Sequence, residues 1–271
     1  MTIVMPEFMP RPEVADPALE VEAVTVRFGA LTAVDEVSLS VRPGGITALI
    51  GPNGAGKSTA FNAMTGYVRL QSGRVRIGPL DLTRMRPDRV SQHGVVRSFQ
   101  KRSVFPAMTV AENLRVGLHR TEAKSLVAAM LGLPSHQRSV ARTRERVAAM
   151  AELIGLEHEL DTPAETLAYG RQRMLAVGVT LCALPRFLLL DEPTAGLNSS
   201  ESAEMAQLLR AVSDHGIGVL LVEHDMKFLL ALSDHVVVLN AGKKIAEGTP
   251  AEIQADEAVR TAYLGERHQA C

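Results

Sequence analysis

One short stretch constrains the fold more than any other: GPNGAGKST, Gly51–Thr59, directly after the apolar run GGITALI. It contains the pattern G-x-x-x-x-G-K-[ST] as Gly51, Gly56, Lys57 and Ser58. Such glycines let backbone N–H groups curl around phosphate oxygens, and the following helix directs its positive end at them. Lys57 then reaches the β- and γ-phosphates, and the Ser58 hydroxyl ligates Mg²⁺. The stretch predicts a strand, a phosphate-binding loop and a helix, whereas an ordinary glycine-rich turn leaves the lysine and serine unexplained.

A second stretch, FLLLDEPTAGLN, supplies the acids that such a loop needs. A buried strand ends in Asp191, which is placed to hold Mg²⁺, and Glu192 follows at once. A carboxylate beside the metal ligand can polarise an attacking water as a general base. A solvated strand end is the alternative, and it accounts less well for two adjacent acids after an apolar run.

The pattern of apolar residues predicts an α/β fold. LEVEAVTVRFG and VDEVSLSV alternate apolar and polar residues, which is typical of half-buried antiparallel strands. A helical pattern runs from Val110 to Gly170, within a helical subdomain that we expect at about 101–185. Beyond it, apolar strands alternate with helices, which indicates a mainly parallel sheet. TPAE, Thr249–Glu252, has the spacing of a capping box at the start of a helix.

The ends of the chain and its charge exclude several classes of protein. We expect a loose tail at 1–17, a folded domain at 18–266 and a short tail at 267–271. The N-terminus lacks the basic start and apolar core of a signal peptide, and no apolar run approaches the ~20 residues that span a bilayer. Lys plus Arg number 29 against 30 for Asp plus Glu, so no basic excess points to nucleic acid.

Together these motifs resemble the ATP-binding subunits of ABC transporters, from about Leu19 to Glu266. Gly51–Thr59 matches the Walker A loop of that family and Phe187–Glu192 its Walker B strand. The resemblance implies a P-loop NTPase fold, an ABC-type nucleotide-binding domain with a mainly parallel core, a small antiparallel β subdomain and a helical subdomain. It also implies ATP and Mg²⁺ as ligands, ATP hydrolysis, and nucleotide contacts from the whole loop: Gly51, Pro52, Asn53, Gly54, Ala55, Gly56, Lys57, Ser58 and Thr59.

Three single residues take roles only through this resemblance. Phe28 stands where the family stacks an aromatic ring on adenine, although core packing is an alternative. Gln100 matches the Q-loop glutamine, which senses the metal and the water, and His224 matches the switch histidine at the γ-phosphate. A lone glutamine is otherwise surface decoration, and a lone histidine is otherwise structural.

The segment LAYGRQ falls at the family signature, commonly LSGGQ. The resemblance implies that Ala168, Tyr169 and Gly170 cap the γ-phosphate of ATP held by an opposing subunit, through backbone groups and a helix N-terminus. Ala168 replaces the usual serine, and its missing hydroxyl removes one phosphate contact. Asn198 stands in the D-loop where many relatives have aspartate, which implies neutral hydrogen bonds across a dimer. The alternative is that Gly170 only eases a loop into a helix.

The tyrosine before the glycine, together with RSFQKRSVFPAMTVAENLRVG and the ending RTAYLGE, is similar to one branch. These are the ATPase subunits of high-affinity branched-chain amino acid importers. Related importers for urea and short-chain amides share much of the pattern. The branch implies two transmembrane permease subunits, a second ATP-binding subunit in a heterodimer or a homodimer, and indirectly a substrate-binding protein. It places the chain at the cytoplasmic face of the inner membrane, held there through the permeases.

Other readings of the same motifs remain open. DNA-repair and chromosome-maintenance ATPases carry long coiled-coil insertions, and translation-type relatives carry two cassettes; neither feature is in this sequence. Export of lipopolysaccharide fits the LAYG signature less well. The basic residues Arg97, Lys101 and Arg102 around Gln100 could face a membrane subunit or form a solvated charged face.

Overall fold

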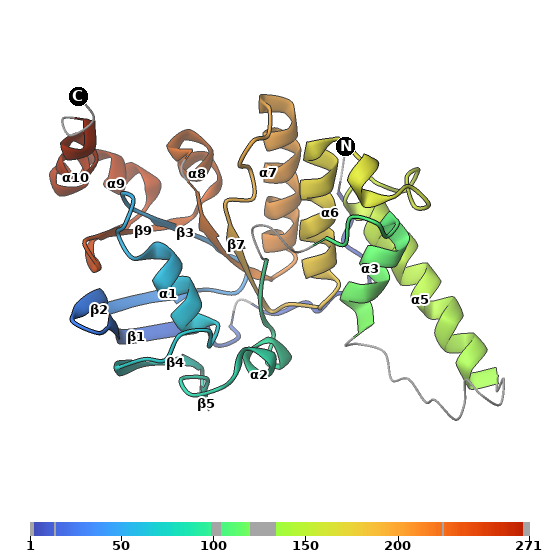
Figure 1. Ribbon diagram of the computed structural model, residues 1–271, viewed down its shortest axis with the longest axis horizontal. Helices are drawn as coiled ribbons and strands as arrows, with labels where there is room; N and C mark the ends of the chain where they lie inside the picture. Colours follow the sequence, from blue (N-terminus) through green and yellow to red (C-terminus); the bar gives the residue numbers. More distant parts are fainter. Residues whose placement is uncertain (1–2, 14, 99–103, 120–133, 224, 268–271) are drawn as a thin grey trace. The chain divides into compact units, whose positions relative to one another are not determined.

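The computed structural model describes residues 3–13, 15–98, 104–119, 134–223 and 225–267. Its contacts divide the chain into two compact units. We call the first the helical unit (1–10, 98–185 and 193–211) and the second the core unit (11–97, 186–192 and 212–271). Figure 1 labels the elements of both. The helical subdomain expected at about 101–185 lies inside the helical unit, which also includes residues 1–10 and 193–211.

A six-stranded sheet in the order β10-β9-β3-β8-β7-β6 forms the centre of the core unit. The pairs from β9 to β6 are parallel, and only the edge strand β10 is antiparallel. Every residue of β3, β7 and β8 is buried, as expected for strands covered on both faces. The strands are β3 (Ile46–Ile50), β6 (Val95–Arg97), β7 (Phe187–Asp191), β8 (Gly218–Val222), β9 (His235–Asn240) and β10 (Lys243–Gly248). The predicted mainly parallel sheet is confirmed.

A second sheet of four strands, ordered β2-β1-β4-β5, is antiparallel throughout. Its strands are β1 (Leu19–Phe28), β2 (Leu31–Val41), β4 (Ser72–Ile77) and β5 (Leu80–Asp81). The helix α1 (Lys57–Met64) contacts β1 and β2. One apolar core includes side chains from both sheets together with Phe61 and Met64 of α1. The small antiparallel β subdomain is therefore confirmed, and it shares its core with the parallel sheet.

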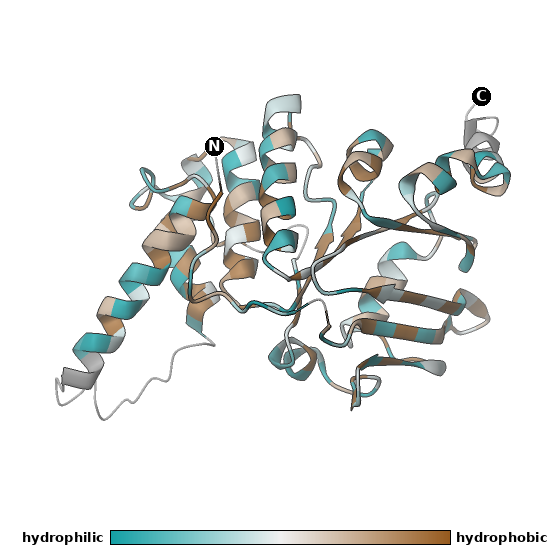
Figure 2. Ribbon diagram, turned by 180° about the vertical axis from the view of Figure 1, so that it is seen from behind, coloured by the Kyte–Doolittle hydropathy of each residue, from teal (hydrophilic) through white to brown (hydrophobic). Residues whose placement is uncertain are grey.

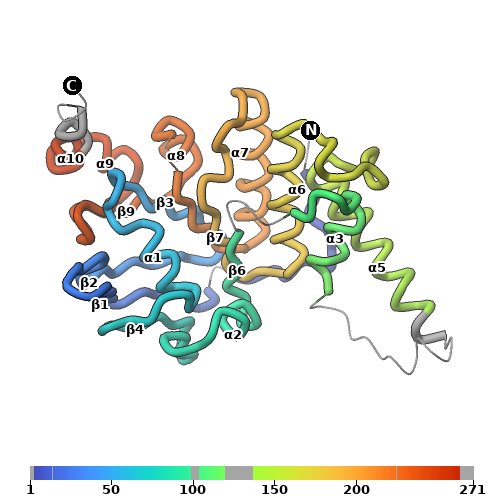
Figure 3. The backbone as a smooth tube through the Cα atoms, viewed as in Figure 1, coloured from blue at the N-terminus to red at the C-terminus, as the bar shows by residue number. Residues whose placement is uncertain are grey.

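The core unit also contains several helices among its described residues. They are α2 (Pro87–Gln92), α8 (Met226–Leu232), α9 (Pro250–Ala255) and α10 (Glu257–Arg267). The capping box predicted from TPAE is confirmed at α9, where Thr249 and Glu252 exchange side-chain and backbone hydrogen bonds. In Figure 3 the chain can be followed from β9 to the last two helices, α9 and α10; β10 lies between them in the sequence.

The helical unit holds α3 (Val110–Leu118), α5 (Pro134–Leu153), the short 3₁₀ turn η2 (Ala164–Thr166), α6 (Tyr169–Leu181) and most of α7 (Ser199–Asp214). Helix α3 packs against α6 and α5. In Figure 2 the long α5 shows alternating teal and brown bands, the mark of an amphipathic helix with one apolar face. Figure 1 shows α6 and α7 running next to each other, and this neighbourhood positions the motifs discussed below.

Part of the expected N-terminal tail is packed. Met9 is 4% exposed, and the Arg146 guanidinium of α5 lies 5.3 Å from the Phe8 ring centroid. The scattered prolines and acids of this segment predict a loose tail. Composition does not indicate which helices the few apolar residues of the segment pack against. Among the described residues, no helix combines the length and hydropathy that crossing a bilayer requires.

Candidate nucleotide site

The predicted phosphate loop connects β3 to α1. Gly56 is the N-cap of α1 and has φ 99°, in the left-handed region. A Cβ there would lie 2.5 Å from the Ala33 carbonyl oxygen, so the turn can form only with glycine. No side chain caps this end of α1. The first N–H groups of the helix are therefore available to an anion.

Lys57 is held inside the loop rather than extended into solvent. The residue is 8% exposed. Its Nζ donates to the carbonyl oxygens of Gly51 at 2.5 Å and Pro52 at 3.0 Å. The sequence predicts Gly51 and Pro52 as nucleotide contacts. In the structure their carbonyl oxygens hold the Lys57 ammonium in place. The positive charge consequently lies in the concave side of the loop.

Asp191 is the last residue of β7, and Glu192 follows it directly. Asp191 pairs with Val222 of β8, at the carboxyl ends of the parallel strands, and is 4% exposed. Glu192 has φ 51°, and its N–H donates to the Val222 carbonyl at 2.8 Å. A left-handed glutamate is uncommon, and such backbone strain gathers at functional sites. This turn carries the Glu192 side chain to the same pocket that receives the loop.

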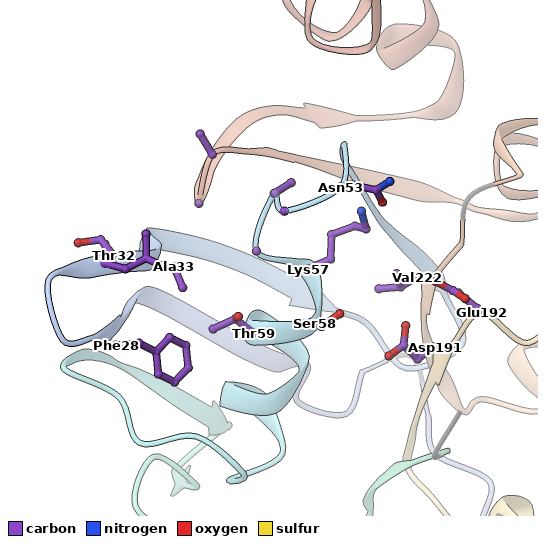
Figure 4. Close-up of a pocket in the computed structure, with 16 residues that line it drawn as sticks. Phe28, Thr32, Ala33, Asn53, Lys57, Ser58, Thr59, Asp191, Glu192 and Val222 are labelled. Atoms are coloured by element: carbon purple, nitrogen blue, oxygen red, sulfur yellow. The ribbon is translucent and has the colours of Figure 1, made fainter. Parts of the chain in front are cut away.

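A cavity of about 590 Å³ in the core unit joins these parts. Figure 4 shows Lys57, Ser58 and Asp191 directed into it from α1 and β7. A hydroxyl and a carboxylate are oxygen ligands of the kind Mg²⁺ prefers, and this ion usually takes one or two protein ligands alongside substrate phosphates. Within the described ranges there is no group of three or more His, Cys, Asp and Glu able to hold a metal. The hydroxyl and the carboxylate fit Mg²⁺.

Phe28 also lines this cavity and is 52% exposed. The alternative that it serves core packing is therefore wrong. An aromatic face exposed at the rim of a phosphate-binding pocket suits stacking on a base. Thr32 and Ala33 at the start of β2 and Ala241 and Gly242 in the turn before β10 also line the cavity, and sequence reasoning missed them because they belong to no motif.

The surroundings of Arg97 contradict both interpretations that the sequence suggests. Its Nη2 lies 3.1 Å from Asp191 Oδ2, with side-chain exposures of 12% and 4%. Its Nη1 donates to Asn62 Oδ1, and its Cζ lies 5.4 Å from the Phe61 ring centroid. It is neither a solvated charge nor a membrane-facing one, because the β6–β7 pairing brings it beside the buried aspartate. Lys101 and Arg102 lie outside the described residues.

The signature residues belong to the helical unit and are not among the residues that line this cavity. Ala168 is the N-cap of α6 and forms no side-chain cap, and Tyr169 and Gly170 begin the helix. Arg171 donates to the Gly155 carbonyl, so its side chain points into its own unit. In the D-loop, the Asn198 Oδ1 accepts from the Glu201 N–H at 3.0 Å. Gln100 and His224, the other two predicted catalytic residues, lie outside the described residues.

Comparisons with known families agree with this geometry. Residues 34–195 match a family model described as ABC transporter. Residues 243–269 match a second model, branched-chain amino acid ATP-binding cassette transporter. The chain is 41% identical over 251 residues to the high-affinity branched-chain amino acid transport ATP-binding protein BraF of Pseudomonas aeruginosa, covering 92% of this chain and 98% of BraF. It is 40% identical over 253 residues to LivG of Escherichia coli, which has the same description, covering 93% and 99%.

A solved structure gives the same result for the fold. A nucleotide-free ATP-binding cassette from an ABC transporter superposes with a TM-score of 0.79 at 30% identity, covering 91% of this chain and 98% of that one. The expected fold class is therefore confirmed by an independent structure.

Proposed function

The chain belongs to the ABC transporter family of ATP-binding proteins, and from that premise we propose that it is the ATP-hydrolysing subunit of an importer for branched-chain amino acids. The observation that carries the proposal is that one cavity is lined both by the loop before α1 and by the two acids at the end of β7, Asp191 and Glu192. A phosphate cradle alone would serve many binding proteins. A phosphate cradle with a buried aspartate and an adjacent glutamate in the same cavity serves hydrolysis.

The proposed roles follow from the positions of the side chains. Phe28 stacks on the base, and the N-terminus of α1 with Lys57 binds the phosphates. Ser58 and Asp191 would hold Mg²⁺, which would supply charge neutralisation at the transferred phosphoryl group. Glu192 orients water and takes its proton as the general base. Gln100 and His224 keep their proposed roles as sensors of the metal, the water and the γ-phosphate.

The proposed site is complete for binding but not for hydrolysis. Every lining residue of the cavity belongs to the core unit, and none of Ala168, Tyr169 and Gly170 is among them. We assign these three residues to the nucleotide of an opposing ATP-binding subunit, as the family resemblance implies. Turnover then requires dimerisation, with a second, different subunit as the expected partner.

The substrate class comes from the relatives rather than from the cavity, since an ATPase of this kind does not contact the cargo. BraF and LivG are named for branched-chain amino acid transport, and residues 243–269 match the model of that branch. We propose two permease subunits and a substrate-binding protein as further partners. The permeases would hold this chain at the cytoplasmic face of the inner membrane.

The test is to purify the chain with its partners from native membranes, using an affinity tag, and to assay the complex in lipid vesicles. ATPase activity should need Mg²⁺ and should rise when the binding protein is loaded with leucine, isoleucine or valine. Stimulation by urea or acetamide alone would move the substrate to short-chain amides. Recovery of the chain with DNA-repair or ribosomal proteins and no permease would overturn the proposal.

A further inference from the structure

We propose that Glu201 and Tyr169 are positioning residues that fasten the signature turn (167–171) to the D-loop (193–198) within one chain. All of these residues belong to the helical unit. Two pairs of contacts carry the proposal, one at Gly170 and one at Gly196. The clamp itself is independent of the proposed function, and only its effect on hydrolysis rests on that function.

Glu201 is fixed by the start of its own helix. The Asn198 N–H donates to Glu201 Oε2 at 2.9 Å, and the Glu201 N–H donates to Asn198 Oδ1 at 3.0 Å. This reciprocal pair is a capping box with asparagine as the N-cap of α7. The cap commits one carboxylate oxygen and therefore sets where the other one lies.

The second oxygen of Glu201 lies against the signature helix. A Cβ built on Gly170 would lie 2.3 Å from Glu201 Oε1 and 2.4 Å from its Cδ. With the glutamate in its cap, position 170 has room only for glycine. Helix α6 has no side-chain cap and no acid in its first turn. A carboxylate from α7 at this end compensates the positive end of the α6 dipole.

Tyr169 forms the second contact pair. Gly196 has φ 81°, and a Cβ on it would lie 2.8 Å from Tyr169 Cε1. The Tyr169 hydroxyl accepts from Arg173 Nε at 3.0 Å, and the Arg173 Cζ lies 5.1 Å from the ring centroid. The ring is thus held between an arginine of its own helix and the D-loop glycine, although the tyrosine is 49% exposed.

The two contact pairs connect the same two segments of the chain. Tyr169 and Gly170 of the signature turn meet Gly196 and Glu201 around the D-loop. A shift of either segment must therefore displace the other or break the α7 cap. Tyr169 replaces a glycine of the common signature, so the substitution adds a ring that the glycine version cannot provide.

A double-mutant cycle on the isolated full-length chain tests the clamp without any assay of function. The variants are Gly170→Ala, Glu201→Ala and the two combined, with Glu204→Ala, one turn further along α7, as the matched control. Gly170→Ala should lower the Tm by about 2–4 °C in the natural background. It should be neutral or raise the Tm when Glu201 is alanine, because alanine is otherwise the better helix former. A neutral Gly170→Ala in the natural background, or an equal loss in both backgrounds, would overturn the clamp.

A second measurement tests positioning in the reaction, using the complex purified through a tag on this chain. Glu201→Ala should lower kcat for ATP by about 10- to 100-fold with little change in KM, because a displaced signature turn misaligns the transition state. Glu201→Gln keeps an oxygen for the Asn198 N–H and should restore most of kcat, and Glu204→Ala should match the natural protein. Equal losses in the glutamine and alanine variants, or none in either, would overturn the positioning role. An inactive natural complex would instead count against the proposed function.

Discussion

Two helix N-termini in this chain share a glycine at or next to the first helical residue, but their surroundings differ. Both α1 and α6 start at or near a glycine and lack a side-chain cap. At α1 the missing Cβ lets the loop approach the Ala33 carbonyl, and a cavity containing Lys57 and Asp191 opens at the helix end. At α6 the missing Cβ makes room for a carboxylate of the same chain. Within one chain, therefore, the glycine at α1 belongs to a pocket with room for an anion, whereas the glycine at α6 makes room for a packed side chain.

Binding and chemistry belong to the cavity at the N-terminus of α1, which Glu192 also lines. The largest expected effect therefore comes from Glu192→Gln. The amide keeps the shape of the side chain but cannot act as a base, and hydrolysis by the complex should fall by about two to four orders of magnitude. ATP affinity, measured by calorimetry, should stay the same. Glu204→Gln serves as the control for a lost carboxylate elsewhere. Natural turnover in the Glu192 variant would transfer the base to another residue, with His224 first in line.

Arg97→Met should have the next largest effect, this time on stability. It leaves the Asp191 carboxylate buried without its ion pair, and breaking such a pair costs about 3–5 kcal/mol. The control is Arg76→Met, whose ion pairs with Glu20 and Glu22 are 36–45% exposed and screened by solvent, so their loss should change stability little. Urea unfolding of the isolated chain measures both. Similar losses in the two variants would mean that the Arg97 pair contributes no more than a surface pair.

Gly170→Asp should affect the α6 terminus in two ways. It should abolish hydrolysis by the complex, because a carboxylate would repel the γ-phosphate brought by the opposing subunit. It should also destabilise the isolated chain by about 1–3 kcal/mol, because it would face Glu201. Hydrolysis and urea unfolding report on the two effects separately. Normal turnover with lowered stability would leave Gly170 with a packing role alone.

Ala168→Ser should have the smallest effect. The change restores a hydroxyl at the N-cap of α6, where the structure has no side-chain cap. One neutral hydrogen bond contributes about 0.5–1.5 kcal/mol, so activity should be equal or somewhat higher and the helix slightly more stable. The ATPase rate of the complex and the Tm of the isolated chain measure this. A marked fall in either would show that the natural alanine is required by packing.

Local patterns predicted most of the fold. The loop Gly51–Thr59, the strand ending in Asp191 and the capping box at Thr249 were read from the sequence because each depends on residues within a few positions of one another. The mainly parallel sheet followed from buried strands alternating with helices. The structure contains each of these features.

Long-range contacts were not predictable in this way. Arg97 and Asp191 lie 94 positions apart, and nothing in either segment indicates that β6 and β7 pair. The contact of Tyr169 with Gly196 depends on how α6 and the D-loop pack, which periodicity does not specify. One signal was present and unused: Asn198 and Glu201 have the capping-box spacing.

The central claim is that one chain holds a complete binding pocket but only half of a hydrolytic site. The most direct measurement is the steady-state ATPase rate of the isolated subunit at saturating Mg-ATP, with light scattering on the same sample, before and after addition of the companion ATP-binding subunit. The account predicts tight binding and slow turnover while the sample is monomeric, and a large rise in rate when the dimer forms. Full turnover by a strictly monomeric sample would contradict it.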